Sequence, residues 1–172
     1  MHPSHPFWSQ EVPRVDGQLL LTPCPGTQQV PLTLALDQLR LAGAHGVVTL
    51  MTSAELIRLE LAPLGQQVEH EGMRWFHLPI EDDLAPDTDF EAAWQQALPQ
   101  LRELLGDGKH LVIHCKGGSG RTGLVAAALL MTLGQPQQEA MAAIKAHRPK
   151  AFTLACHRQW LDQLAERLAQ GD

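Results

Sequence analysis

The residues best suited to chemistry lie in one continuous run, from His114 to Thr122. Its glycines and serine carry no bulky side chains, so the backbone can bend until successive N–H groups point into one concavity. An apolar segment follows and predicts a helix whose positive N-terminal end would reinforce an anion site there. The sequence therefore predicts a phosphate-binding loop, with substrate-binding residues Lys116, Gly117, Gly118, Ser119, Gly120 and Arg121.

Cys115 opens this loop and is the candidate nucleophile. The surrounding N–H groups and the helix dipole would stabilise its thiolate, which is the nucleophilic form of cysteine. Arg121 offers a planar fork of donors that fits two phosphoryl oxygens. Thr122 can donate its hydroxyl to the sulfur when the sulfur becomes a leaving group. His114 is better suited to shape the loop from behind than to act as an acid or base.

The elements around the loop must bring it to the surface of a packed sheet. The apolar segment His110–His114 predicts a buried strand that ends at Cys115, and Leu124–Leu133 predicts a buried helix after the loop. Strand and helix patterns alternate through most of the chain. We expect an α/β fold with a mostly parallel central sheet flanked by helices on both sides. Ligands of such sheets bind beyond the carboxyl ends of the strands, where the loop begins.

Length and composition fit one domain. The chain has 172 residues and a formal charge of −6, and we expect a single domain over 1–172 with an irregular N-terminal lead over about 1–16. The acidic balance disfavours nucleic acid or an anionic membrane as partners. Three cysteines are too few for a disulfide framework, and the sequence contains no apolar run long enough for a membrane span. These features predict a cytoplasmic protein.

The run from His114 to Thr122 resembles the HC-x5-R-[ST] signature of the cysteine-dependent protein tyrosine phosphatase superfamily. The distribution of features along the chain resembles the compact dual-specificity group, and so its fold. Three further segments are similar to the kinase-associated phosphatases within that group: Leu39–Gly43, Thr52–Leu56 and Leu78–Asp82.

This resemblance implies a two-step hydrolysis of a phosphate monoester. Cys115 takes the phosphoryl group, and an upstream aspartic acid protonates the leaving oxygen and then activates water. The family's acid loop aligns with Pro79–Asp82 and selects Asp82, with Asp83 as the second choice and Asp87 as the third. Arg121 and backbone donors neutralise the developing charge, so neither a metal nor a cofactor is expected.

One departure from the family concerns the hydrolytic water. Many dual-specificity phosphatases orient it with a glutamine on the last helix, and His157 holds the matching position here. His157 is therefore expected near the site, and the residue that positions the water is left open.

Several functions remain for a protein with this loop. The expected partners are a phosphorylated protein substrate, modified on tyrosine or on serine and threonine, and phosphate or another oxyanion bound in the loop. A phosphoinositide or small-molecule phosphatase and a phosphate-binding pseudophosphatase are the alternatives, with Lys116 as a possible contact for an acidic substrate. A Walker nucleotide-binding loop would need lysine where Arg121 stands, so that class is disfavoured.

Overall fold

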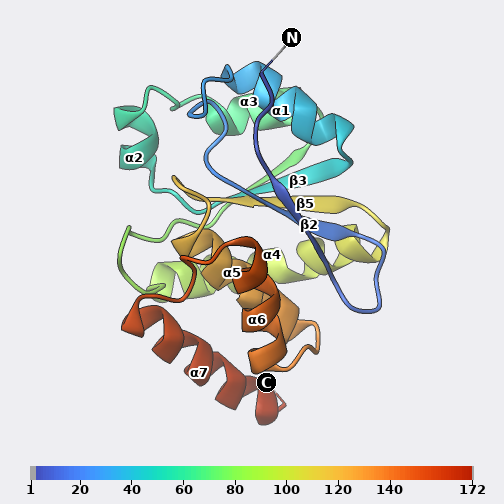
Figure 1. Ribbon diagram of the computed structural model, residues 1–172, viewed down its shortest axis with the longest axis vertical. Coiled ribbons are helices and arrows are strands. Elements are labelled where there is room, and N and C mark those ends of the chain that lie inside the picture. The colour runs from blue at the N-terminus through green and yellow to red at the C-terminus, as the bar shows by residue number, and fades with distance from the viewer. Residues whose placement is uncertain (1–2, 172) are drawn as a thin grey trace.

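The computed structural model describes residues 3–171, which form one five-stranded sheet between two layers of helices (Figure 1). The strands are β1 (Trp8–Glu11), β2 (Gln18–Thr22), β3 (Ala44–Thr49), β4 (Arg74–His77) and β5 (His110–His114). The helices are α1 (Leu32–Leu41), α2 (Ser53–Arg58), α3 (Leu64–His70), α4 (Thr88–Gly106), α5 (Gly120–Thr132), α6 (Gln137–His147) and α7 (Ala155–Ala169).

The sheet has the order β1-β2-β5-β3-β4, so β5 lies at its centre. Its inner strands pair in parallel, with Val112 of β5 opposite Leu20 of β2 and Val47 of β3. Only β1, at the edge, runs antiparallel. The expected α/β architecture with a mostly parallel sheet is confirmed, and β5 delivers Cys115 to the carboxyl edge between two neighbouring parallel strands.

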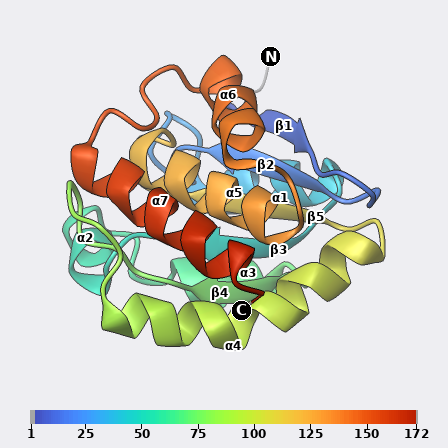
Figure 2. The same ribbon diagram turned by 90° about the horizontal axis from the view of Figure 1, so that it is seen from below.

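Both faces of the sheet are covered, as the continuous apolar runs of the strands predicted. Alternate residues of β5 divide between two cores: Leu111 and Ile113 face α4 and α5, whereas Val112 faces α1 and α3. Figures 1 and 2 show α1, α2 and α3 on one side of the sheet and α4, α5, α6 and α7 on the other. Helix α5 is buried on every side, which explains why its sequence lacks a polar face.

Two elements differ from the sequence-based picture. The N-terminal segment expected to be irregular contains β1, in which Trp8 pairs with Leu21. Its charged and polar residues hid the strand because an edge strand needs only one apolar face. A short helix, α3, was also missed, since its Gly65 and its length of only seven residues weaken the helical signal.

No helix within residues 3–171 combines the length and the apolar character needed to cross a membrane.

The packing of α5 predicts a stability effect that can be measured. Leu129 of α5 is fully buried, and Leu129→Ala should lower the free energy of unfolding by about 3 kcal/mol through lost burial and a residual cavity. Leu41→Ala is the matched control, because Leu41 ends α1 with 71% of its surface exposed and should change stability by less than about 0.5 kcal/mol. Urea unfolding measures both, and equal losses would contradict the burial of α5.

Candidate active site

A hollow of about 300 Å³ opens at the carboxyl edge of β5. It is formed by three segments distant in sequence: the loop after β5, the acidic turn after β4, and the connection from α6 to α7. Its lining residues are Asp82, Asp83, Cys115, Lys116, Gly117, Ser119, Gly120, Arg121, Lys150, Phe152, Thr153, Leu154 and His157. Of the predicted loop residues, only Gly118 does not line the hollow.

Cys115 is 4% exposed and accepts two hydrogen bonds at its sulfur. The backbone N–H of Gly118 donates to Sγ at 3.3 Å, and the Thr122 hydroxyl donates at 3.1 Å. Both donors favour negative charge on the sulfur, because a thiolate is the stronger acceptor. The structure thus brings Cys115 and Thr122 into the contact that the sequence predicted.

Gly118 has a left-handed backbone, with φ of 78°. A Cβ atom there would lie 2.6 Å from the backbone of Thr22 and Pro23, so no other residue fits. The neighbouring Cys24 N–H donates to the Lys116 carbonyl at 3.0 Å. The segment after β2 therefore supports the loop from behind, and the contribution of Gly118 to the site is its N–H group.

The loop continues into α5 without a side-chain cap. Ser119 occupies the N-cap position, makes no side-chain capping hydrogen bond, and no acidic residue follows in the first turn. The first N–H groups of this 13-residue helix are therefore left to bind something else, and the positive end of the helix dipole faces the hollow. An oxyanion fits this environment.

Arg121 is 3% exposed and is held by the carboxylate of Glu55, for which the sequence analysis assigned no role at the site. Its Nη1 and Nη2 donate to Glu55 Oε1 and Oε2 at 2.8 and 2.9 Å, and Nη1 also donates to the Ile80 carbonyl at 2.8 Å. Glu55 meanwhile closes a capping box with Thr52 at the start of α2. One carboxylate therefore both caps α2 and orients the guanidinium.

Burial opposes the charge on both members of this pair, but their mutual contact outweighs it. The pKa of Glu55 is lowered because hydrogen bonds from Arg121 and Thr52 overcome the cost of burial. The pKa of Arg121 is raised because the opposing cost of burial is outweighed by Glu55, together with the nearby Cys115 and Asp82. Both side chains are charged at neutral pH.

The three candidate acids occupy different positions. Asp82 Oδ1 lies 3.6 Å from Arg121 Nη2, and the Asp82 side chain is 63% exposed at the rim of the hollow. Asp83 also lines the hollow, in a left-handed conformation with φ of 65°. Asp87 instead caps α4, where its carboxylate accepts from the Phe90 N–H at 2.8 Å. Asp82 has the contact that ties it to the arginine of the site.

His114 is fully buried behind the loop in a chain of hydrogen bonds. Burial lowers the pKa of His114 to about 4, although a hydrogen bond to the Cys115 carbonyl opposes this, so the ring is neutral at pH 7. The carbonyl requires Nδ1–H as donor at 3.2 Å, which leaves Nε2 to accept from the Thr49 hydroxyl at 2.7 Å. Trp75 donates in turn to Thr49 at 2.8 Å. His114 thus fixes the loop, as its sequence position suggested.

His157 of α7 lines the hollow and is bound to the acidic turn. Burial lowers the pKa of His157, against the effect of its hydrogen bond to Leu84, so its neutral ring donates Nε2–H to the Leu84 carbonyl at 2.9 Å. Nδ1 is buried and makes no hydrogen bond within residues 3–171. This contact connects α7 to the segment that carries Asp82 and Asp83.

Sequence reasoning missed several wall residues and one ion-pair partner. Lys150, Phe152 and Leu154 reach the hollow only because α6 and α7 fold back beside α5. Phe152 adopts a left-handed backbone with φ of 65°, and no local sequence motif predicts this conformation. Glu55 has the spacing of a capping box with Thr52, but its role as the partner of Arg121 depends on a residue 66 positions away.

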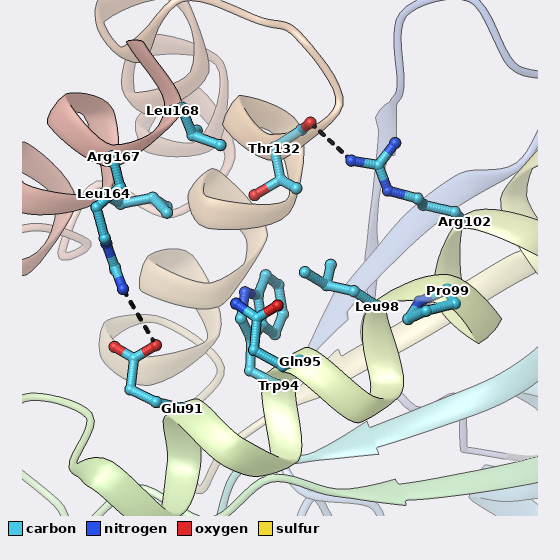
Figure 3. A pocket seen from close by; sticks show the side chains of 10 residues that line it. All are labelled: Glu91, Trp94, Gln95, Leu98, Pro99, Arg102, Thr132, Leu164, Arg167 and Leu168. Atoms are coloured by element: carbon cyan, nitrogen blue, oxygen red, sulfur yellow. Dashed lines mark hydrogen bonds and ion pairs between the residues drawn. The ribbon is translucent and has the colours of Figure 1, made fainter. Parts of the chain in front are cut away.

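A second hollow, of about 390 Å³, lies between α4, α5 and α7 (Figure 3). Trp94, Leu98 and Leu164 form its apolar walls, and Arg167 pairs with Glu91 at 3.6 Å across one end. It contains neither cysteine nor an anion-binding loop. Among residues 3–171, no group of three or more histidine, cysteine or acidic side chains is arranged to hold a metal ion.

The comparisons with known proteins agree on one family. A family model described as Tc-R-P, polymorphic toxin system, DSP-PTPase phosphatase, matches residues 25–135. Cyclin-dependent kinase inhibitor 3 of Rattus norvegicus is 32% identical over 105 residues, which cover 59% of this chain and 48% of that protein. Putative tyrosine phosphatase 067L of Invertebrate iridescent virus 3 is 31% identical over 102 residues, covering 56% of this chain and 42% of that protein.

The chain spans about half the length, 48% and 42%, of these curated relatives. Among solved structures, kinase associated phosphatase (KAP), with its catalytic site cysteine substituted by serine, matches with a TM-score of 0.85. The two sequences are 22% identical, and the match covers 98% of each chain. This similarity confirms the expected dual-specificity phosphatase fold.

The Glu55–Arg121 pair predicts a loss of stability on neutralisation. Glu55→Gln leaves a buried guanidinium without its counter-charge, and at pH 7 we expect a loss of about 3 kcal/mol in the free energy of unfolding. The difference between the two proteins should shrink as the pH falls below 4.5, because the unfolded wild-type chain then protonates Glu55 while the folded protein, in which the pKa of Glu55 is lowered, still holds it ionised.

Glu71→Gln is the matched control for this variant. Glu71 pairs with Arg40 at the surface, where the arginine is 43% exposed, so the loss should stay below about 1 kcal/mol. Denaturant unfolding at several pH values measures both. Equal small losses would show that the buried pair does not hold the site together.

The burial of His114 predicts that the folded protein loses stability over a defined range of acidic pH. The unfolded chain protonates this histidine near pH 6.5, whereas the folded pKa is about 4, so stability should fall between those values as the pH falls. One proton accounts for at most about 1.4 kcal/mol per pH unit. His114→Asn should flatten this slope, and His70→Asn, at an exposed position of α3, should not. Identical slopes in all three proteins would contradict the burial of a neutral His114.

Proposed function

This chain belongs to the DSP-PTPase phosphatase family, and from that premise we propose that it hydrolyses phosphate monoesters on proteins through a phosphocysteine intermediate on Cys115. The observation that carries the proposal is the sulfur at the base of an anion-binding loop, with Gly118 and Thr122 as donors to it. The proposed enzyme is a single domain over residues 1–172 and uses neither a metal nor a cofactor.

The first step transfers the phosphoryl group. The Cys115 thiolate attacks phosphorus, a P–S bond forms, and the bond from phosphorus to the leaving oxygen breaks with its electron pair on that oxygen. Asp82 donates a proton to the oxygen, so the product leaves as a neutral hydroxyl. The N–H groups of the loop and of α5 receive the phosphoryl oxygens, which gain negative charge in the transition state.

One edge of the Arg121 guanidinium makes no hydrogen bond within residues 3–171 and is available for this purpose. The contacts with Glu55 and Ile80 use both hydrogens of Nη1 and one of Nη2. Nε–H and the second hydrogen of Nη2 form a fork that fits two phosphoryl oxygens. Glu55 therefore supports catalysis by presenting this edge, and Arg121 need not break its ion pair to bind substrate.

The second step releases phosphate. Asp82, now ionised, takes a proton from water as the water oxygen bonds to phosphorus, and the P–S bond breaks with its electrons on sulfur. The Thr122 hydroxyl, 3.1 Å from Sγ, stabilises the departing thiolate. His157 supports this step by holding the acidic turn through Leu84. We assign His157 this positioning role in place of direct contact with the water.

The ion contact of Asp82 favours it over Asp83 as the acid. Its Oδ1 lies 3.6 Å from Arg121, so a substrate bound by that arginine would present its leaving oxygen close to the Asp82 carboxyl. Asp83 accepts a weak contact at its backbone carbonyl from Cys156, at 3.9 Å, and its left-handed backbone turns the chain toward Leu84.

The proposed substrate is a phosphorylated protein side chain, and the proposed location is the cytoplasm. Phe152 and Leu154 supply apolar wall to the hollow, which suits the carbon atoms next to a phosphorylated hydroxyl. Cys24, Cys115 and Cys156 are all unpaired thiols, a state that a reducing compartment maintains.

The test is hydrolysis of a small aryl phosphate. Cys115→Ser should abolish turnover, and Cys156→Ser, at a thiol of α7 that does not line the hollow, should retain it. Asp82→Ala should lower kcat by about a hundredfold, as expected for loss of a general acid. Asp83→Ala should change kcat by less than about threefold, the scale of a surface substitution.

Two results would overturn the assignments. Turnover by Cys115→Ser at the wild-type rate would exclude the phosphocysteine route, and a crippled Asp83→Ala beside an active Asp82→Ala would move the acid by one residue. Phosphotyrosyl and phosphothreonyl peptides and a phosphatidylinositol phosphate, compared by kcat/KM, then define the substrate class. A preference for the lipid would replace the protein substrate proposed here.

A further inference from the structure

Arg148 binds the outer side of the phosphate-binding loop. It follows α6 directly, and its Nε and Nη2 donate to the carbonyls of Gly118 and Gly117 at 3.0 and 2.9 Å. These are carbonyls of consecutive residues, so one guanidinium holds two successive peptide units. Arg148 does not line the hollow itself and could not be found from the loop motif.

The two peptide units have their N–H groups on the opposite side. In a trans peptide unit the C=O and N–H bonds point in opposite directions. The unit whose oxygen Arg148 holds at Gly117 carries the N–H of Gly118, which donates to Cys115 Sγ at 3.3 Å. The unit held at the Gly118 oxygen carries the N–H of Ser119 in the same way. Holding the oxygens outward therefore turns the N–H groups inward.

The guanidinium is itself held by an aromatic ring. Arg148 Cζ lies 4.1 Å from the centroid of the Trp8 ring, within the range of a strong cation–π contact. Trp8 belongs to β1, which pairs with β2, and Figure 2 shows α6 beside this edge of the sheet. The half-buried ring thus fixes the plane of the guanidinium, and the plane decides which carbonyls its donors reach.

We propose that Arg148, which packs against the Trp8 ring, is a positioning residue that orients the N–H donors of the phosphate-binding loop toward Cys115 and the phosphoryl oxygens. The inference deepens the proposed function and rests on it for the identity of the bound group. The positive charge of Arg148 also polarises both peptide units, which makes their N–H groups better donors. Both Trp8 and Arg148 lie outside residues 25–135 matched by the family model.

Arg148→Met is the main test, because methionine fills the space without donors. With an aryl phosphate, kcat/KM should fall by about tenfold to a hundredfold. This is at most the effect of removing one hydrogen-bond donor to the transition state, because the N–H groups are displaced and not removed. The inhibition constant for vanadate should rise by a similar factor. The pH midpoint for alkylation of Cys115 by iodoacetamide should rise by about one unit, since a tenfold loss of thiolate stabilisation has that effect.

Two conservative variants separate positioning from stability. Arg148→Lys keeps the charge but replaces the planar fork of two nitrogens, each bound to one carbonyl, with a single ammonium nitrogen, so its alkylation midpoint should also rise. Trp8→Phe keeps an aromatic platform and should restore the wild-type midpoint that Trp8→Leu loses. Arg102→Met is the matched control: Arg102 also donates to a carbonyl, that of Thr132 at 3.2 Å, but on the surface away from the loop. It should leave midpoint, vanadate inhibition and kcat/KM unchanged.

The outcomes distinguish this inference from the proposed function. The wild-type protein could fail to hydrolyse phosphate monoesters while Arg148→Met still shifts the alkylation midpoint of Cys115. That result would support the positioning role and refute the proposed function. A wild-type midpoint and vanadate affinity in Arg148→Met would overturn the positioning role, even if its melting temperature fell. Should Arg148→Met fail to fold, the midpoints of Arg148→Lys and Trp8→Leu decide the question, and wild-type values in both overturn it.

Discussion

The ion pair between Arg121 and Glu55 is the contact on which the arrangement of the site depends. It joins the first turn of α5 to the first turn of α2, and through the Ile80 carbonyl it also holds the segment that leads to Asp82. These parts come from opposite faces of the sheet. Because both charges are buried, removing either would leave the other without compensation, so the three segments are held together as a unit.

The loop itself is held from several sides in a comparable way. His114 binds it from within the sheet, Thr22 and Pro23 close against Gly118, and Arg148 holds its outer carbonyls. Each contact is directed at backbone, which is the part that would bind a phosphoryl group. Rigid, prearranged N–H donors lower the barrier of a reaction because they need not reorganise when charge develops.

The phosphate-binding loop could be predicted from the sequence because its parts are contiguous. Strand β5, the glycine-rich turn and α5 follow one another, so Cys115, Arg121 and Thr122 are placed by local geometry. Glu55, Phe152 and Arg148 could not be found in this way, since each reaches the loop through the path of the whole chain. The edge strand β1 was missed because most of its residues are polar, and its contact with Arg148 through Trp8 depends on a residue from beyond α6. The net charge of −6 likewise says little about a site whose positive character comes from N–H groups and the buried Arg121.

The central claim is that the phosphoryl group passes through Cys115, and trapping the intermediate tests it most directly. Asp82→Ala, mixed with a radiolabelled aryl phosphate and quenched in acid within one turnover, should carry the label on the peptide that contains Cys115. Mass spectrometry should locate one phosphoryl group on the sulfur, and Cys115→Ser should remain unlabelled. Label on another residue, or turnover of the wild type with no labelled protein at any time, would contradict this account.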